Sequence, residues 1–478
     1  NIIGTIGPAS ESEEVFTNLV RAGLGVARIN FSHGGYEENA EKIATIKRVR
    51  EKLNKPVALL LDTKGPEIRT GDFVGGKTSF KKGQTSVICV EDIVGTSERF
   101  TITYKDLYKD VKPGGFILVN DGQVELLVDH VDGTDIVCIC ANDGVVKNKR
   151  GINVPGIKLG FDYLSPKDIS DLTFGAHQPF DYVAASFCRR AHDFIAASFV
   201  RRPQDVLDVK KLLIENGRPE IQIIAKIENS EGVENMDEIL KVADGIMVAR
   251  GDLGVEIPAE DVPLIQKELI NKCRAAGKIV ITATQMLDSM QENPRPTRAE
   301  VSDVANAIYD GTDAIMLSGE SAQGKYPVEA VETMTKIALK TEGTLDYASL
   351  QRKAIRTAPL DQSEAICMSV AEIASKFNVA AIVAFTDSGF TARKMSRYRT
   401  KSMIIAATPN EQTTRALAIN WGVKSVLCKQ MDTRAAMIEY AQVIAKENLV
   451  EPGEQIIVTA GTPGVAGTTS YLELITVK

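Results

Sequence analysis

The sequence predicts an α/β protein: a (β/α)8 TIM barrel with an inserted small β-barrel lid domain, followed by a C-terminal open α/β domain. Three observations lead to this fold class. Short runs rich in Val and Ile alternate with amphipathic segments, a stretch of short alternating strands interrupts that series, and a second alternating series begins near residue 341. With 478 residues, the chain is long enough for two or three domains with their own cores.

Eight apolar runs are expected to form the barrel. Near-continuous hydrophobic strands separated by helical patterns are typical of a parallel sheet that is covered on both faces. Seven runs are clear, at residues 2–6, 26–31, 57–61, 221–227, 245–249, 278–283 and 314–317. Helical patterns between them include residues 11–21, 36–53, 260–276 and 298–309.

The fourth strand comes from one of two near-identical segments. Residues 181–190 read DYVAASFCRR and residues 193–202 read DFIAASFVRR. We expect the second segment to form the strand, because it leads directly into a helix that starts near Pro203. The first segment is then an insertion or an artefact of the recorded sequence.

An all-β insertion interrupts the third barrel unit. After Asp62 the pattern changes to short alternating strands with Gly turns, at residues 85–90, 100–104, 116–119, 124–128 and 136–140. We assign residues 70–156 to this lid and residues 1–69 and 157–343 to the barrel. A lid on a βα loop lies over the carboxyl ends of the strands, where it is able to exclude water.

The C-terminal domain is assigned to residues 344–478, with residues 344–359 as a linker. Helices are expected at residues 363–377, 412–421 and 435–446, and strands at residues 379–385, 403–407 and 456–460.

Composition excludes several classes of protein. The net charge of -7 and the lack of a basic run give no indication of a nucleic-acid partner. The longest apolar runs are far too short to cross a bilayer, and no signal peptide is recognised. Seven scattered cysteines indicate reduced thiols of a cytoplasmic protein and no zinc site. A metal, if one is bound, would be held by carboxylates, which favours Mg²⁺ or Mn²⁺.

Polar groups follow six of the predicted strands, and in such barrels these ends meet at one rim. Lys226 and Glu228 are two residues apart on a strand, so their side chains share a face. Glu228 together with Asp252 on the next strand makes a two-carboxylate magnesium site, and Lys226 supplies a fixed charge for a migrating phosphoryl group. The alternative is an ion pair that closes the barrel mouth. Arg28 and Arg69 on the same rim favour a polyanionic ligand instead.

An oxygen-rich group with one formal charge lies at the ends of strands two and three. It consists of Asn30, Ser32, Asp62 and Thr63. This set suits a monovalent cation better than a second magnesium ion. Capping of the next helix by Asn and Ser is an equally good interpretation of the spacing alone.

Seven motifs in order resemble the pyruvate kinase family, and the resemblance covers essentially the whole chain. They are NFSHG (30–34), LDTKGPEIRT (61–70), AKIEN (225–229), MVARGDLGVEIP (247–258), TATQMLDSM (282–290), NPRPTRAE (293–300) and MLSGE (316–320). The resemblance implies transfer of the phosphoryl group of phosphoenolpyruvate to ADP, which gives pyruvate and ATP in glycolysis. It also implies a regulatory C-terminal domain and a homotetramer.

The resemblance also implies roles for individual residues. Phosphoenolpyruvate would be bound by Arg28, Lys226, Gly251, Asp252 and Thr284, with Lys226, Arg28 and Thr284 acting in catalysis. Glu228 and Asp252 would hold Mg²⁺ or Mn²⁺, and Asn30, Ser32, Asp62 and Thr63 would hold K⁺. Arg69 and Arg150 would contact the nucleotide. Family members that need potassium have Glu at the position of Glu67.

Two other functions remain open to the residues alone. A magnesium-dependent barrel lyase or aldolase acting on pyruvate-like substrates would share the carboxylate pair, but it would not need Arg69, Arg150 or a nucleotide lid. A non-catalytic scaffold of this fold would be expected to lose Lys226 or a metal carboxylate, and this chain keeps all three.

A phosphate cradle is predicted in the C-terminal domain. Residues 386–391 (TDSGFT) follow a strand and lead into a helix, and the candidate ligands are Thr386, Ser388, Gly389 and Thr391. Spacing alone fits an ordinary turn with a Thr cap. The resemblance favours a phosphorylated allosteric effector, such as fructose 1,6-bisphosphate.

Overall fold

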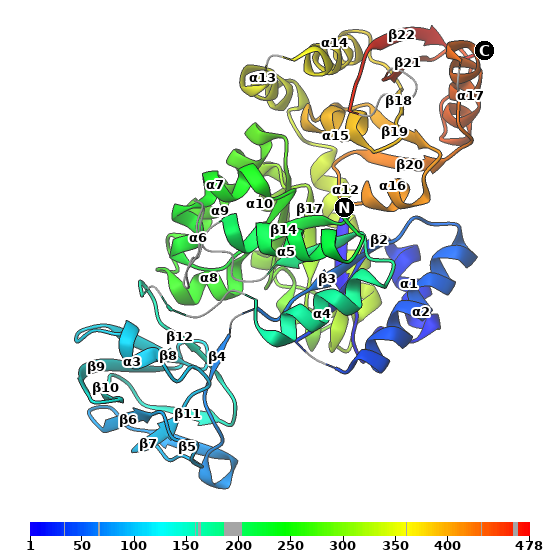
Figure 1. The fold of residues 1–478 in the computed structure, drawn as a ribbon. Helices are drawn as coiled ribbons and strands as arrows, with labels where there is room; N and C mark the ends of the chain where they lie inside the picture. The colour runs from blue at the N-terminus through cyan, green and yellow to red at the C-terminus, as the bar shows by residue number, and fades with distance from the viewer. Residues whose placement is uncertain are drawn as a thin grey trace.

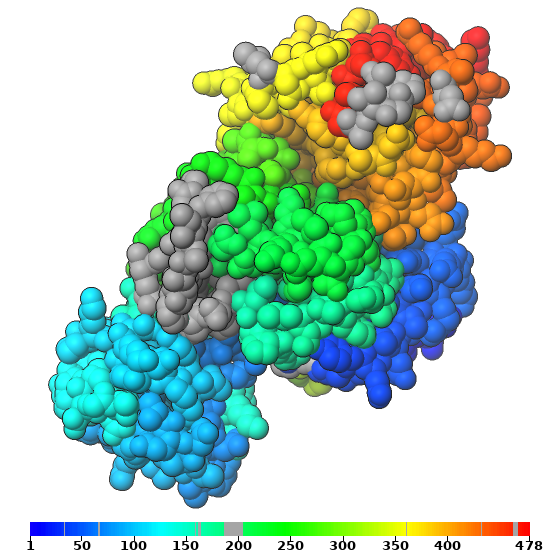
Figure 2. Space-filling view, viewed as in Figure 1, coloured from blue at the N-terminus to red at the C-terminus, as the bar shows by residue number. Residues whose placement is uncertain are grey.

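A computed structural model describes residues 1–32, 34–65, 67–157, 159–160, 164–185, 203–359, 361–431, 433–461 and 467–478. Figure 1 shows three bodies, with a barrel in the middle and a β-rich lid and an α/β domain at its opposite ends. The lid protrudes as a separate lobe in the space-filling view (Figure 2). No helix in the described ranges is both long and apolar enough to span a membrane.

The central body is a closed barrel of eight parallel strands, as the sequence predicts. The strand order is β1-β17-β16-β15-β14-β13-β3-β2. The strands are β1 (Ile2–Thr5), β2 (Leu24–Asn30), β3 (Ala58–Asp62), β13 (Tyr182–Ala185), β14 (Gln222–Ile227), β15 (Gly245–Ala249), β16 (Ile279–Ala283) and β17 (Ala314–Leu317).

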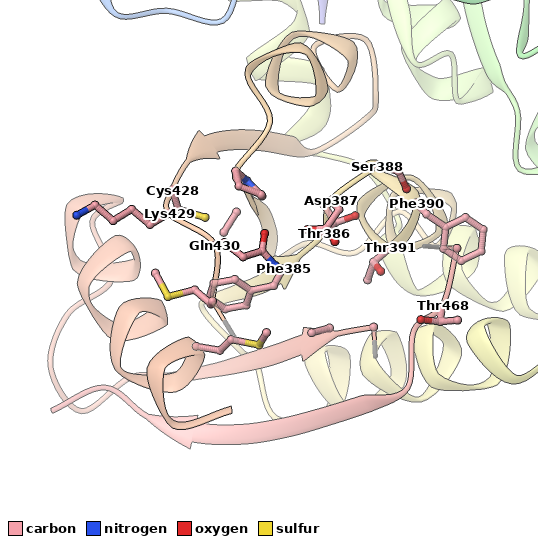
Figure 3. Close-up of a pocket in the computed structure, with 17 residues that line it drawn as sticks. Phe385, Thr386, Asp387, Ser388, Phe390, Thr391, Cys428, Lys429, Gln430 and Thr468 are labelled. Carbon is pink, nitrogen blue, oxygen red and sulfur yellow. The ribbon is translucent and has the colours of Figure 1, made fainter. Parts of the chain in front are cut away.

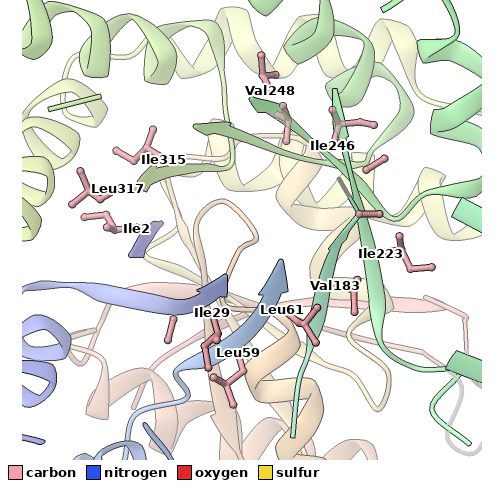
Figure 4. Close-up of a cluster of buried hydrophobic side chains, with 14 of the residues drawn as sticks. Ile2, Ile29, Leu59, Leu61, Val183, Ile223, Ile246, Val248, Ile315 and Leu317 are labelled. Atoms are coloured by element: carbon pink, nitrogen blue, oxygen red, sulfur yellow. The ribbon is translucent and has the colours of Figure 1, made fainter. Parts of the chain in front are cut away.

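Each barrel strand is buried on both faces, which explains its continuous apolar sequence. In β3, Leu60 belongs to the cluster that fills the barrel interior, while Leu59 and Leu61 belong to the cluster beneath the helices. Figure 4 shows side chains of this second cluster arranged around the strands. Alternation of the two faces along a strand follows from its two-residue period.

The helices around the barrel begin and end where local signals place them. In α10, Thr297 and Glu300 form a capping box, and Gly311 ends the helix in the left-handed conformation. The barrel-domain helices are α1 (Glu13–Ala22), α2 (Tyr36–Leu53), α4 (Pro166–Ala176), α5 (Pro203–Glu215), α6 (Ser230–Glu234), α7 (Met236–Val242), α8 (Arg250–Glu256), α9 (Val262–Ala276), α10 (Arg298–Asp310), α11 (Gly319–Ala322) and α12 (Pro327–Glu342), with a 3-10 turn η2 (Asp288–Gln291).

The prediction for the fourth strand was wrong. The first of the two near-identical segments forms β13, with Val183 paired to Leu61 on one side and Ile223 on the other. Asp181 fixes this register, because its Oδ2 accepts a hydrogen bond of 3.0 Å from the backbone N–H of Leu59. The second segment lies outside the described residues. The sequence did not distinguish the two copies because their apolar patterns are the same.

The lid is a small β-barrel whose sheet closes through a short contact. Its main sheet has the order β4-β12-β8-β9-β10-β6-β7, and a second sheet pairs β11 with β5. The two edge strands meet where the N–H of Thr103 donates to Arg69 O and the N–H of Gly71 donates to Thr101 O, both at 2.8 Å. The elements are β4 (Ile68–Arg69), η1 (Val74–Gly76), β5 (Lys77–Phe80), β6 (Thr85–Cys89), β7 (Arg99–Thr101), α3 (Leu107–Asp110), β8 (Phe116–Val119), β9 (Val124–Asp132), β10 (Asp135–Cys140), β11 (Gly144–Lys147) and β12 (Gly151–Asn153).

The C-terminal domain is a five-stranded sheet, ordered β20-β19-β18-β21-β22, with helices on it. Its elements are α13 (Tyr347–Thr357), α14 (Gln362–Lys376), β18 (Ala381–Phe385), α15 (Phe390–Arg397), β19 (Met403–Thr408), α16 (Glu411–Ala416), β20 (Val423–Leu427), α17 (Arg434–Glu447), β21 (Gln455–Ala460) and β22 (Tyr471–Thr476). The sequence did not predict β20 and β22.

Two predictions for this domain were wrong. The expected linker contains α13, an amphipathic helix that packs against α9 and α14. The helix expected over residues 412–421 ends at Ala416, because the residues after it close the base of the barrel. Ile419 is fully buried in the barrel-interior cluster, and the Tyr182 hydroxyl donates to the carbonyl of Ala416.

Candidate functional site

A buried arginine begins the charged cluster at the carboxyl ends of the barrel strands. Arg28, on β2, is 8% exposed, and its Nε donates to Asp62 Oδ2 on β3 at 2.6 Å. Its Nη1 donates to Thr5 Oγ1 at the end of β1, at 2.7 Å. Sequence analysis missed Thr5, although its position as the last residue of a barrel strand was a usable signal. These contacts fix the guanidinium at the rim.

Lys226 extends the cluster along the rim. Its Nζ lies 2.8 Å from Glu228 Oε1 and 3.4 Å from Asp62 Oδ1, and only 11% of its side chain is exposed. Burial lowers the pKa of Lys226, but Asp62 and Glu228 outweigh it and hold the pKa above its ordinary value. The ammonium is therefore charged. The ion pair that sequence analysis kept as an alternative is present.

The predicted metal carboxylates, Glu228 and Asp252, face the same space. Glu228 is fully buried and follows β14, while Asp252 lies in the first turn of α8. Burial raises the pKa of Asp252, and Lys226 and a hydrogen bond with Glu228 only partly oppose the rise. A buried carboxylate and a half-buried one that lie within hydrogen-bond reach of each other match the donor set that Mg²⁺ or Mn²⁺ prefers.

Thr284 and Gly251 form a polar contact beside the carboxylates. The backbone N–H of Gly251 donates to Thr284 Oγ1 at 2.7 Å. Thr284 has a φ of 70°, a left-handed conformation that a β-branched residue rarely adopts. Arg250 braces this turn, since its Nη2 donates to Thr284 O and its Nη1 to Asp303 Oδ1, both at 2.7 Å. Sequence analysis gave Arg250 no role.

The four predicted potassium ligands divide into two kinds in the structure. Asn30 Oδ1 accepts from the N–H of Ser32 at 3.0 Å, the local turn that sequence analysis allowed. Asp62 is held between Arg28 and Lys226, and Thr63 contacts the carbonyl of Ala184. Asn30 and Asp62 end the neighbouring strands β2 and β3 and are paired in register, and Ser32 and Thr63 follow them in the chain.

The predicted nucleotide residues lie where the lid joins the barrel. Arg69 Nη2 pairs with Glu67 Oε1 at 2.6 Å, and its Nη1 donates to Lys149 O at 2.8 Å. Arg150 is exposed on the segment that precedes β12. The lid also contacts α8 directly, through a hydrogen bond of 2.9 Å from Asn153 Nδ2 to Glu256 Oε1. Helix α8 also carries Asp252, so the lid contacts the helix that carries this predicted metal ligand.

A pocket in the C-terminal domain contains the predicted effector segment (Figure 3). Thr386, Ser388 and Thr391 line it, and Lys429 and Thr468 line it from other segments. Gly389 has a φ of 80°, and an added Cβ would lie 2.6 Å from the Arg393 side chain. Thr391 is 1% exposed, and its hydroxyl lies 2.9 Å from that of Thr469. Ser388 is therefore the more accessible hydroxyl.

The cysteine side chains of the described ranges form neither disulfides nor a metal cluster. Six cysteines in the described ranges are free thiols, and Cys188 lies outside them. Within those ranges, no group of three or more His, Cys, Asp and Glu side chains is placed to hold a metal. A two-carboxylate site falls below that number and remains compatible with this result.

Comparison with known proteins gives consistent matches. A family model described as pyruvate kinase, barrel domain, matches residues 1–194 and 192–331, and one described as pyruvate kinase, alpha/beta domain, matches residues 364–475. A protein named pyruvate kinase from Clostridium acetobutylicum is 49% identical over 100% of this chain and 99% of its own length. Another from Geobacillus stearothermophilus is 50% identical over 99% of this chain and 79% of its own length. The two barrel matches meet at residues 192–194, where the second near-identical segment begins.

Proposed function

The chain belongs to the pyruvate kinase family, and we propose that the cluster around Lys226 is where it carries out the family's reaction. The enzyme transfers the phosphoryl group of phosphoenolpyruvate to ADP and gives pyruvate and ATP. The lyase or aldolase alternative is set aside, since the matches extend over the whole chain. The observation that supports the site is a pair of buried cations, Arg28 and Lys226, held by one carboxylate, Asp62.

The two cations would neutralise the phosphoryl group as its bond to the enol oxygen breaks and its bond to ADP forms. Positioning and charge neutralisation are the main contributions of a protein to such transfers. Lys226 is already charged, so its positive charge is in place before substrate binds. The enolate that remains takes up a proton from a water molecule, which Thr284 Oγ1 would orient.

Members of this family need a divalent metal and potassium. Glu228 and Asp252 would hold Mg²⁺ or Mn²⁺, which when bound neutralises phosphoryl and carboxylate oxygens of the substrate. Asn30, Ser32, Asp62 and Thr63 would hold K⁺, with Glu67 nearby. Substrate phosphate would draw Arg28 and Lys226 away from Asp62 and leave that carboxylate to the monovalent ion. Assays in potassium and tetramethylammonium salts at equal ionic strength test this, and full activity in tetramethylammonium would contradict it.

Arg69 and Arg150 would contact the nucleotide from the lid side. Arg69 pairs with β12 and Arg150 precedes it, and Asn153 of the same strand bonds to Glu256 on the helix that carries Asp252, which supports this. We propose that residues 70–156 form the lid, residues 1–69 and 157–343 the barrel, and residues 344–478 a regulatory domain. We also propose that the enzyme is a cytoplasmic homotetramer.

The pocket around Ser388 would bind the phosphate of an allosteric effector. Ser388→Glu places a negative charge at an exposed position of this pocket and should abolish activation by fructose 1,6-bisphosphate without changing basal turnover. Ser369→Glu, on the exposed face of α14, is the matched control and should respond like the parent. An unchanged response in Ser388→Glu would place the effector site elsewhere.

A coupled assay for pyruvate tests the function as a whole. We expect pyruvate to form only when phosphoenolpyruvate, ADP, a divalent metal and the enzyme are all present. Formation of pyruvate from phosphoenolpyruvate at the same rate without ADP would indicate hydrolysis and would contradict the proposed transfer.

A further inference from the structure

A second charged pocket lies at the opposite end of the barrel, between the barrel and the C-terminal domain. It is lined from the barrel by Arg274, Lys278 and Asp313. Arg393, Arg397 and Arg399 line it from the C-terminal domain. Five of these six side chains are cationic and one is a carboxylate. We call this the basal pocket.

Three arginines of the basal pocket have donors that are not used. The Nε atoms of Arg274, Arg397 and Arg399 are buried and have no hydrogen-bond partner among the described residues. Arg397 is 8% exposed and Arg399 is 3% exposed. An unpaired buried donor on a charged group is costly, and three in one pocket indicate a ligand that accepts hydrogen bonds.

The other atoms of these arginines hold the two domains together. Arg399 Nη1 donates to Asp313 Oδ1 at 2.7 Å and Nη2 to Gly311 O at 3.0 Å. Arg397 Nη2 donates to Ala275 O at 2.6 Å, at the end of α9. Cations at helix ends are an ordinary structural feature. That role uses the Nη atoms and leaves the Nε donors unexplained.

The charge of the basal pocket is not balanced by its own carboxylate. Asp313 is engaged by Arg399 and also accepts from the N–H of Val280 at 2.9 Å. Burial and the neighbouring charge of Arg399 lower the pKa of Arg274 to about 10. Glu364, outside the pocket, lies 3.6 Å from Arg397 but 2.7 Å from Lys394. Buried charge of one sign needs a counter-charge to be stable.

We propose that the basal pocket binds an inorganic oxyanion, phosphate or sulfate, that bridges the barrel and the C-terminal domain. Guanidinium groups match the oxygens of such ions, and Arg274, Arg397 and Arg399 line the cavity from both domains. The cavity volume is about 20 Å³, which leaves no room for a sugar phosphate. Asn420 Oδ1, also buried at this pocket without a hydrogen-bond partner among the described residues, is an acceptor and does not contribute to binding an anion.

Helix α15 connects this site with the effector pocket. Its first residues, Phe390 and Thr391, line the effector pocket, and its last residue, Arg397, lines the basal pocket. Eight helical residues span about 12 Å. An anion in the basal pocket would therefore hold one end of α15 against the barrel while the other end meets the effector.

Thermal unfolding in phosphate tests the proposal in solution. Parent, Arg274→Met and Arg415→Met are compared in potassium phosphate and in potassium chloride of equal ionic strength. Among the described residues, the Arg274 side chain makes one hydrogen bond, to Asp310 O at 3.5 Å, so methionine should keep the packing of its stem and lose little hydrogen bonding. Arg415 also joins the two domains, by pairing with Asp181 at 3.2 Å, but it does not line the basal pocket.

We expect phosphate to raise the melting temperature of the parent and of Arg415→Met alike. The rise should be smaller in Arg274→Met, because loss of one charged donor weakens binding about tenfold or more. Phosphate bound at the active site or the effector pocket contributes equally to all three proteins. An equal rise in all three would overturn the proposal.

Crystals of the full chain grown with selenate, an analogue of sulfate and phosphate, locate the ion directly. We expect an anomalous peak within hydrogen-bond distance of Arg274, Arg397 and Arg399. Selenate peaks only elsewhere, or a basal pocket that takes bromide but not selenate, would overturn the assignment of an oxyanion. This measurement does not depend on how the variants fold.

Discussion

The two ends of the barrel carry charged clusters of opposite design. At the carboxyl ends of the strands, Arg28, Asp62, Lys226 and Glu228 alternate in sign and pair with one another. At the amino ends, five cations share one lining carboxylate, Asp313. The first cluster is balanced before ligand binds, so substrate and metal must exchange partners with it. The second has more positive than negative charge, so an anion adds to it without displacing Asp313.

Because of this difference, we expect the two clusters to affect different properties of the protein. In the proposed active site, the paired charges compensate one another until a phosphoryl group and a cation take their place as partners. Excess charge at the basal end has no such compensation and must be met by a bound ion. Mutations at the active end should therefore appear in turnover, and mutations at the basal end in stability.

The largest effect is expected for Lys226→Met. Removing the fixed charge beside the transferring group should lower turnover by about a hundred- to thousandfold, the range measured for loss of one such donor. The measurement is the rate at saturating phosphoenolpyruvate, ADP and magnesium, with circular dichroism to verify folding. Lys267→Met, an exposed lysine on α9, is the matched control and should keep full turnover. Turnover of Lys226→Met within a few-fold of the parent would remove Lys226 from catalysis.

At the basal end, Asp313→Asn should lower the free energy of unfolding by about 3 kcal/mol, because it leaves Arg399 buried without its carboxylate. Denaturant unfolding in chloride buffer measures this. Asp310→Asn, which pairs with an exposed lysine, should cost about 1 kcal/mol or less. In phosphate buffer, Asp313→Asn should lower the free energy of unfolding by less than in chloride. The variant pocket carries more net positive charge, so it should bind phosphate more tightly. Equal losses in the two variants would contradict the contrast between the two ends.

The proximity of Lys226, Glu228 and Asp252 at the active end could be predicted from the sequence for a physical reason. The residues there follow barrel strands, and the closed parallel barrel brings all strand ends to one rim, so Lys226, Glu228 and Asp252 were predicted to meet. The pairing of Asp62 with both cations was not predicted, because strand order alone does not give side-chain distances.

The basal pocket could not be found in this way. Arg274 ends α9, while Arg397 and Arg399 lie at the end of α15, more than a hundred residues away. Only the docking of the C-terminal domain brings them together. That docking depends on residues 417–421, which the sequence placed in a helix and the structure places at the barrel base. The sequence also could not show which of the two near-identical segments forms β13, because both have the same apolar pattern.

Asp252→Asn should have opposite effects on metal binding and on metal-free stability. Burial raises the pKa of Asp252 above its unfolded value. Its favourable contribution is present below the ordinary carboxyl pKa and is lost as pH rises through the raised pKa. At pH 7 the charged carboxylate therefore destabilises the metal-free protein.

The variant removes that charge, so without metal it should melt above the parent at pH 7 and lose this advantage as the pH is lowered. It should also need much more magnesium for activity, since one of two carboxylates is gone. Asp237→Asn, at an exposed position on α7, should change neither property. An unchanged magnesium curve for Asp252→Asn would rule Asp252 out as a ligand.

The smallest effect is expected where the lid meets the active end, at Asn153→Ala. This change removes the hydrogen bond of 2.9 Å to Glu256 and leaves the barrel strands untouched. A single hydrogen bond contributes about 1 kcal/mol, so the lid should approach α8 less often and the KM for ADP should rise by roughly fivefold at most. Turnover at saturating ADP should stay near the parent value, because Lys226 and the metal carboxylates lie on the barrel. Asn142→Ala is the matched control, since Asn142 bonds to Gln123 within the lid. A fall in turnover without a change in KM would show that the contact serves the chemical step and not the nucleotide.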